Sequence, residues 1–82
     1  MRLDKYLKVS RLIKRRTLAN EACDRGLVSV NGKVQRASYD VRVGDRLSLS
    51  FGAHTVTVEV LEVRENAAAA DAAALYREVS RT

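Results

Sequence analysis

The residues of this chain whose chemistry is most distinctive are the cations at its beginning. The first sixteen residues, MRLDKYLKVSRLIKRR, contain seven lysine and arginine side chains and a single acid, Asp4. Both cationic groups bind phosphate, and the planar guanidinium can grip a phosphate with two hydrogen bonds or stack on a base. This segment therefore indicates binding of a polyanion. The candidate contacts are Arg2, Lys5, Lys8, Arg11, Lys14, Arg15 and Arg16.

The positive charge is concentrated in one part of the chain. The 82 residues carry a formal net charge of +5. Residues 1–50 hold twelve cations against five acids, whereas residues 51–82 hold three against five. Such asymmetry is typical of proteins that bind nucleic acid, with an anionic membrane surface as the second reading. Because a small core needs the leucines of the basic segment for itself, we favour nucleic acid over membrane.

The predicted second helix helps to separate RNA from DNA. It offers Asn20, Glu21 and Asp24, and the two acids would be repelled in a phosphate-lined DNA groove. A shallow basic face of helix edges and a hairpin suits structured RNA instead. Lys33 and Arg36 either extend this face or serve only solubility. A DNA-binding regulator and a protein-binding adaptor stay open as alternatives.

Enzymatic and metal chemistry have no visible basis in the residue types. Cys23 is the only cysteine and His54 the only histidine, so the chain cannot form an internal disulfide or a Cys/His zinc site. The acids Glu59, Glu62 and Glu65 offer no paired-carboxylate geometry. We expect a protein without enzymatic activity, cofactor or metal.

Two helices are expected to position the cations. The first, over Arg2–Val9, places Leu3 and Leu7 one turn apart, and Asp4 suits the positive end of the helix dipole. The second is predicted from about Arg15 to Arg25, with Gly26 as its left-handed stop. The residues expected on its packed face are Leu18, Ala19, Ala22 and Cys23.

A small antiparallel sheet of about four strands is expected next. The Asn31-Gly32 pair between valines is a strong signal for a two-residue hairpin. Gly44-Asp45 marks a turn before an alternating strand that ends at Phe51. The alternation over Thr55–Val63 predicts a further strand, with a bulge or strand end near Val60–Leu61.

The last part of the chain reads differently. The stretch NAAAADAAALYREVSRT predicts an Ala-rich helix after a mobile linker over 65–70. Tyr6 and Phe51 are expected in the core. The fold class is therefore α+β, with two N-terminal helices packed on a small antiparallel sheet plus a C-terminal helix. No apolar stretch approaches the ~18 residues of a transmembrane helix, so we expect a cytoplasmic protein.

Several short motifs occupy the first fifty residues. They are Arg2-Leu3-Asp4 with Leu7, Arg16 with Ala19, Gly26, Val28, Val30-Asn31-Gly32-Lys33, Ser38, Val41 and Gly44-Asp45. Together they resemble the RNA-binding domain named after the S-four protein of the small ribosomal subunit. The resemblance implies that two helices and a hairpin, the αL motif, form an RNA-facing surface. It also implies this domain over 1–63, with its core motif over about 1–50, and a linker and C-terminal helix over 64–82.

Within that superfamily the chain is most similar to the RqcP (YabO) family, in the run from Lys8 to Ala19 and in the ending Ala74-Leu75-Tyr76. The resemblance implies a monomeric factor of bacterial ribosome-associated quality control. Its implied partners are large-subunit rRNA, peptidyl-tRNA on the large ribosomal subunit, and RqcH, which adds C-terminal alanine tails to stalled chains. A heat-shock-type protein that recycles separated large subunits is the alternative, although its family has a longer basic tail.

The resemblance also implies roles for individual residues. Arg2 and Arg16 match the family's RNA-contacting arginines, and Asp4 is expected to orient one of them. The family usually has Ser or Thr where this chain has Arg15, so the second helix is expected to lack the usual cap.

Overall fold

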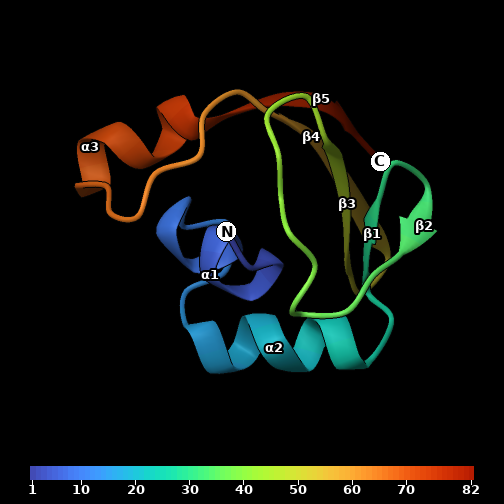
Figure 1. Cartoon of the computed structure of the whole chain (residues 1–82). Coiled ribbons are helices and arrows are strands. Elements are labelled where there is room, and N and C mark those ends of the chain that lie inside the picture. The colour runs from blue at the N-terminus through green and yellow to red at the C-terminus, as the bar shows by residue number, and fades with distance from the viewer.

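The computed structural model describes all 82 residues and places the helices on one side of a five-stranded antiparallel sheet (Figure 1). The strand order is β2-β1-β3-β4-β5. This arrangement confirms the predicted α+β class. The elements in chain order are α1 (Leu3–Val9), α2 (Arg16–Asp24), β1 (Val28–Val30), β2 (Lys33–Val34), β3 (Arg46–Phe51), β4 (His54–Val60), α3 (Ala69–Ala72), the 3-10 turn η1 (Ala73–Leu75) and β5 (Tyr76–Arg81).

Helix α1 is the centre of the hydrophobic core. Its residues Leu3, Tyr6 and Leu7 are fully buried, as their one-turn spacing predicts. The Tyr6 hydroxyl donates a hydrogen bond of 2.8 Å to the backbone carbonyl of Leu75. This bond ties α1 to the C-terminal part of the chain. No helix of the chain combines the length and the apolar character that crossing a bilayer requires.

Helix α2 packs through small residues. Ala19 and Cys23, one turn apart, are buried, whereas Leu18 is 47% exposed. The prediction that Leu18 belongs to the packed face is wrong, because Ala19, Cys23 and the partly buried Ala22 form the contact with the core instead. Arg15 occupies the N-cap position in extended conformation, and no side chain caps the helix there. The expected absence of a Ser or Thr cap is therefore visible in the structure.

The predicted hairpin is present between β1 and β2. Asn31 and Gly32 form its turn with φ angles of 51° and 85°, the positive values that a two-residue turn of this type needs. The Asn31 side chain donates to a carboxylate oxygen of Asp45 at 3.1 Å and accepts from the backbone N–H of Arg46 at 3.0 Å. The hairpin tip is thereby fixed to the turn that precedes β3.

Strands β3 and β4 alternate between core and solvent as predicted. Strand β4 ends at Val60, which confirms the expected strand end, and the register shift lies between Thr57 and Val58 instead. Phe51 is 44% exposed, so its assignment to the core is wrong. It pairs with His54 at the far end of the hairpin between these strands, beyond the area that the helices cover.

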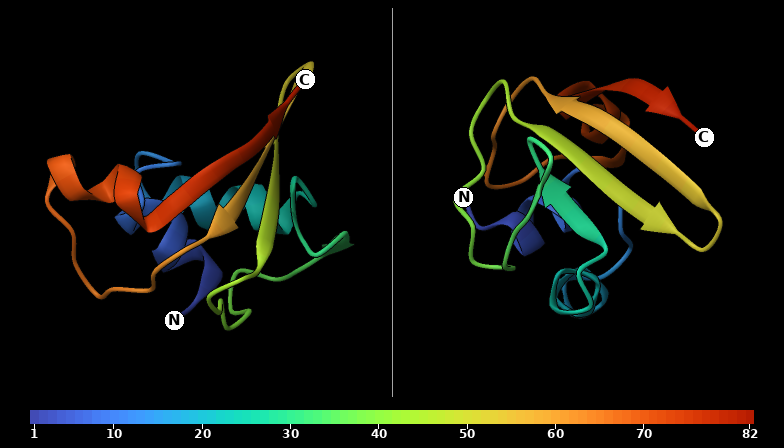
Figure 2. Two further views of the ribbon diagram at one scale, coloured as in Figure 1. Left: turned by 90° about the horizontal axis from the view of Figure 1, so that it is seen from above. Right: turned by 90° about the vertical axis from the view of Figure 1, so that its right-hand side faces the viewer.

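The C-terminal region differs most from the prediction. Only Ala69–Ala72 is α-helical, and Tyr76–Arg81 forms strand β5 along the free edge of β4 (Figure 2). The edge of β4 offers backbone N–H and carbonyl groups that need partners. Hydrogen bonding to them outweighs the helix preference of the residues after Ala74, where the alanine run ends. Leu75 is fully buried, and residues 61–68 have no regular secondary structure. The mobility of residues 65–70 stays a prediction.

Candidate RNA-binding surface

Asp4 lies at the centre of the N-terminal basic residues and is buried to 2% relative exposure. Its Oδ1 accepts hydrogen bonds from Arg2 Nε at 3.1 Å and from the backbone N–H of Lys5 at 2.8 Å. Its Oδ2 accepts from Arg2 Nη2 and from Asn20 Nδ2, each at 3.3 Å, and lies 3.5 Å from Arg16 Nε. One buried carboxylate therefore holds two guanidinium groups from two different helix ends.

The charge state of Asp4 follows from this geometry. Burial raises the pKa of its carboxyl, but the hydrogen bonds from Arg2 and Asn20 and the charge of Arg16 lower it by more, so the pKa lies below the usual Asp value. The hydrogen bond with Asp4 also raises the pKa of Arg2. Asp4 is thus ionised at neutral pH and contacts both arginines, where one was expected.

The two arginines keep part of their binding capacity. The side chains of Arg2 and Arg16 are 48% and 49% exposed. Each guanidinium has five N–H donors, and Asp4 engages at most two of them. The remaining donors are available to a phosphate, and their orientation is set in advance by the buried acid.

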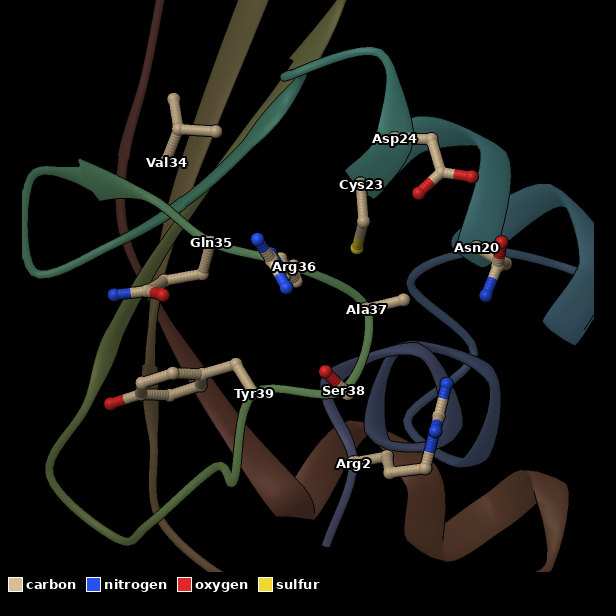
Figure 3. A pocket seen from close by; sticks show the side chains of 10 residues that line it. All are labelled: Arg2, Asn20, Cys23, Asp24, Val34, Gln35, Arg36, Ala37, Ser38 and Tyr39. Atoms are coloured by element: carbon tan, nitrogen blue, oxygen red, sulfur yellow. The ribbon is translucent and has the colours of Figure 1, made fainter.

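A cleft of about 690 Å³ opens beside this pair, between α2 and the segment that follows β2 (Figure 3). Arg2 and Asn20 stand on one side, and Arg36 lines the cleft from the segment after β2. The Cys23 sulfur faces the middle of the cleft. Burial, followed by the nearby Asp4 and Asp24 charges, raises the pKa of this thiol to about 11. Cys23 is therefore a neutral, apolar lining residue, which agrees with its expected place on the packed face of the helix.

The other candidate cations occupy different places. Lys5 forms an ion pair with Glu65, sixty residues away in sequence. Lys33 lies exposed on β2, and Arg15 is exposed before α2. Lys8, Arg11 and Lys14 lie at the opposite end of α1 from Arg2, where they line a second, smaller cleft. Two groups therefore stand out within the predicted set: Arg2 and Arg16 at Asp4, and the three cations at the smaller cleft. Lys5, Arg15 and Lys33 belong to neither group.

Ion pairing also distinguishes the cations of the chain. Seven of the fifteen lysine and arginine side chains make an ion pair, which leaves eight without one. Those without a partner are concentrated before residue 47, where polyanion binding is expected. They are Lys8, Arg11, Lys14, Arg15, Arg25, Lys33, Arg36 and Arg46.

Asn20 is the site residue whose position the sequence reasoning missed. From the sequence, Asn20 is expected to face a groove, whereas in the structure it donates to Asp4. The available signal was its spacing: Arg16 and Asn20 are one turn apart on α2 and so lie on the same face. What the sequence did not show is that this face meets Asp4 of α1.

Comparisons with known proteins cover most of the chain. The family model described as "S4 domain" matches residues 1–47, which contain α1, α2 and the hairpin. The chain is 54% identical over 76 residues to the RQC P-site tRNA stabilizing factor of Bacillus subtilis (strain 168), covering 93% of this chain and 88% of that protein. It is 48% identical over 82 residues to the factor of the same name from Streptococcus pneumoniae, covering 100% of this chain and 93% of that protein.

A solved structure supports the fold over nearly the full length. The chain superimposes with a TM-score of 0.90 on Heat Shock Protein 15 of Vibrio cholerae, described as trimeric, at 32% identity. The match covers 98% of this chain and 82% of that one. Identity is thus much higher to the tRNA stabilizing factors than to the heat-shock protein. The chain carries an S4 domain and belongs to the family of RQC P-site tRNA stabilizing factors.

Proposed function

We propose that this protein binds the large ribosomal subunit and its P-site tRNA during ribosome-associated quality control. The observation that carries the proposal is the pair of arginines, Arg2 and Arg16, that buried Asp4 holds half exposed within the S4 domain. The printed name of the relatives, RQC P-site tRNA stabilizing factor, supplies the ribosomal context.

The proposed role needs binding alone. A tRNA backbone and large-subunit rRNA repel each other, and a cationic protein between them lowers that repulsion. Arg2 and Arg16 would each grip a phosphate with donors that Asp4 does not use, and Arg36 would add a contact from the neighbouring cleft. We assign the protein no catalytic step, cofactor or metal. We further propose that it acts as a monomer in the cytoplasm.

The finer part of the proposal concerns the partner proteins. By holding tRNA on the large subunit, the chain would support RqcH-dependent addition of C-terminal alanine tails to stalled nascent chains. Recycling of separated large subunits, the heat-shock alternative, receives less support because the structural relative of that name is only 32% identical. The acids on α2, Glu21 and Asp24, remain the physical argument against a DNA-binding regulator.

The decisive experiment is co-sedimentation with purified large subunits, with and without P-site tRNA. We expect Arg16→Ala to weaken binding at least about tenfold, because a charge-assisted contact to phosphate contributes about 1.5–3 kcal/mol. Arg81→Ala, which removes an equal charge from β5, serves as the matched control and should bind as wild type. Tighter binding to duplex DNA than to large subunits, or equal binding by wild type and Arg16→Ala, would contradict the proposal.

A further inference from the structure

A second cleft lies at the C-terminal end of α1, away from Asp4. One wall consists of Lys8 in the last turn of the helix and of Arg11 and Lys14 in the loop that follows. The other wall consists of Asn66 and Ala67 from the segment before α3. The cleft encloses about 90 Å³. That volume is sufficient for a small group such as a phosphate.

The charge of this cleft is unbalanced. None of its three cations makes an ion pair, and no carboxylate is among its lining residues. Lys8 alone would be explained by the helix dipole, since it lies in the last turn of α1. Arg11 and Lys14 lie beyond the helix, so the dipole does not account for them. Three cations around one cleft, with no acid among its lining residues, make the local electrostatic potential positive, which favours binding of an anion.

The loop has the shape that brings these cations together. Arg11 has a φ of 61°, the left-handed conformation that is uncommon for any residue other than glycine. Its backbone N–H donates to the carbonyl of Lys8 at 3.0 Å, and that of Ile13 donates to the carbonyl of Leu7 at 3.1 Å. The chain therefore turns back sharply after α1, and the side chains before and after the turn meet at one cleft.

The opposite wall is held in place by the C-terminal part of the chain. Glu65, next to Asn66, forms the ion pair with Lys5 of α1. The backbone N–H groups of Leu61 and Glu62 both donate to the carbonyl of Leu75, at 2.9 and 3.1 Å. The same carbonyl accepts from the Tyr6 hydroxyl. This wall lies outside residues 1–47, so the S4 domain alone does not form the cleft.

We propose that this cleft binds one backbone phosphate of a second RNA segment, separate from the phosphate bound by Arg2 and Arg16. The inference rests on the proposed function and adds a second contact point to it. The two sites lie at opposite ends of α1, whose seven residues span about 10 Å along the helix axis. A protein with two separate phosphate sites can contact two RNA strands at once, as bringing a tRNA against rRNA requires.

The test is a titration of the full chain followed by amide NMR, with two probes in separate arms: a short RNA hairpin and inorganic phosphate. We expect the hairpin to shift the amide signals of Arg11, Lys14, Asn66 and Ala67 as one group, and those of Arg16 and Asn20 as another. If inorganic phosphate shifts the first group as readily as the hairpin does, the site is one for the free ion and the proposal is overturned.

Two variants make the outcome specific. Lys14→Glu should weaken the response of the Asn66 group by about tenfold and leave the Asn20 group unchanged, because it reverses one of three charges on an exposed side chain. Asn66→Asp, which changes only the far wall, should weaken the same group. Glu78→Gln on β5 is the control and should respond as wild type.

The two proposals can fail separately. If the hairpin shifts the Asn20 group and leaves Asn66 and Ala67 unshifted, the second site is wrong and the proposed function stands. If the hairpin shifts neither group, both are wrong. If Lys14→Glu reduces both groups equally, there is one continuous surface and the second site is likewise overturned.

Discussion

The cations at the two ends of α1 differ in their ion pairing. At its N-terminal end, Asp4 is buried and holds Arg2 and Arg16 in fixed positions. At its C-terminal end, Lys8, Arg11 and Lys14 have no ion-pair partner. The charge of an ion-paired arginine is partly offset by the acid that orients it, whereas the charge of an unpaired cation is not offset and its side chain keeps its conformational entropy. The first end is suited to geometric recognition and the second to longer-range attraction.

The substitution expected to have the largest effect on this difference is Asp4→Asn. Without the carboxylate, Arg2 and Arg16 repel each other and their orientation is lost, so we expect a loss of about 1–3 kcal/mol in the free energy of unfolding. RNA affinity should fall as well. Urea unfolding and RNA titration measure the two effects. Glu78→Gln, which removes an exposed acid paired with Arg81, is the control and should change stability by less than about 0.5 kcal/mol. An Asp4→Asn variant as stable as wild type would contradict the comparison.

The same difference should depend on pH. The pKa of Asp4 is lowered in the folded protein, so its contribution to stability is fully present above the usual Asp pKa of about 3.9 and is lost as the pH falls through the lower folded value. Urea unfolding of wild type and Asp4→Asn from pH 6 down to pH 2 measures this. The gap between the two proteins should be constant above about pH 5 and should close below about pH 4. A gap that widens in acid would refute the assignment.

Salt should distinguish the two ends next. Arg16→Ala removes a contact with defined hydrogen bonds, so its affinity loss of about tenfold should persist at high salt. Lys14→Ala removes a point charge, so its loss of about two- to fivefold at low salt should fade as salt is raised. Lys14→Ala should therefore reduce the slope of log K against log salt by about 0.7–0.9, whereas Arg16→Ala should reduce it by clearly less. Identical salt profiles for the two variants would remove the distinction.

The smallest expected effect comes from Tyr6→Phe. The change removes the hydroxyl that donates to Leu75 and so loosens the wall of the second cleft, at a cost of about 0.5–1.5 kcal/mol in unfolding free energy. Binding at Arg2 and Arg16 should be unchanged, while the NMR response of Asn66 should weaken. If both binding sites weaken together, the C-terminal wall has no separate role.

The sequence predicts well those features of the fold that depend only on residues close together in the chain. The Asn31-Gly32 turn needs two positive φ angles, and few residue pairs other than these supply them, so the hairpin was predictable. The buried stripe of α1 follows from its one-turn spacing in the same way. The motifs that carry the family resemblance lie in these local elements.

What sequence did not predict depends on contacts between distant segments. The C-terminal stretch favours a helix by composition, but the unpaired edge of β4 converts Tyr76–Arg81 into a strand. The exposure of Phe51 and Leu18 depends on which area the helices cover. The division of the basic residues also depends on long-range contacts, because Glu65 and Asn66 reach α1 only through the folded C-terminal segment.

The central claim is that Asp4 acts on RNA binding through the arginines that it holds. A double-mutant cycle of Asp4→Asn and Arg16→Ala, with affinity for large subunits carrying P-site tRNA as the readout, tests it most directly. The account predicts coupling between the two residues. Asp4→Asn should weaken binding less in the Arg16→Ala background than in wild type, and the difference between the two losses should be about 0.5–3 kcal/mol. Strictly additive losses would contradict the account, because Asp4 and Arg16 would then contribute to binding independently.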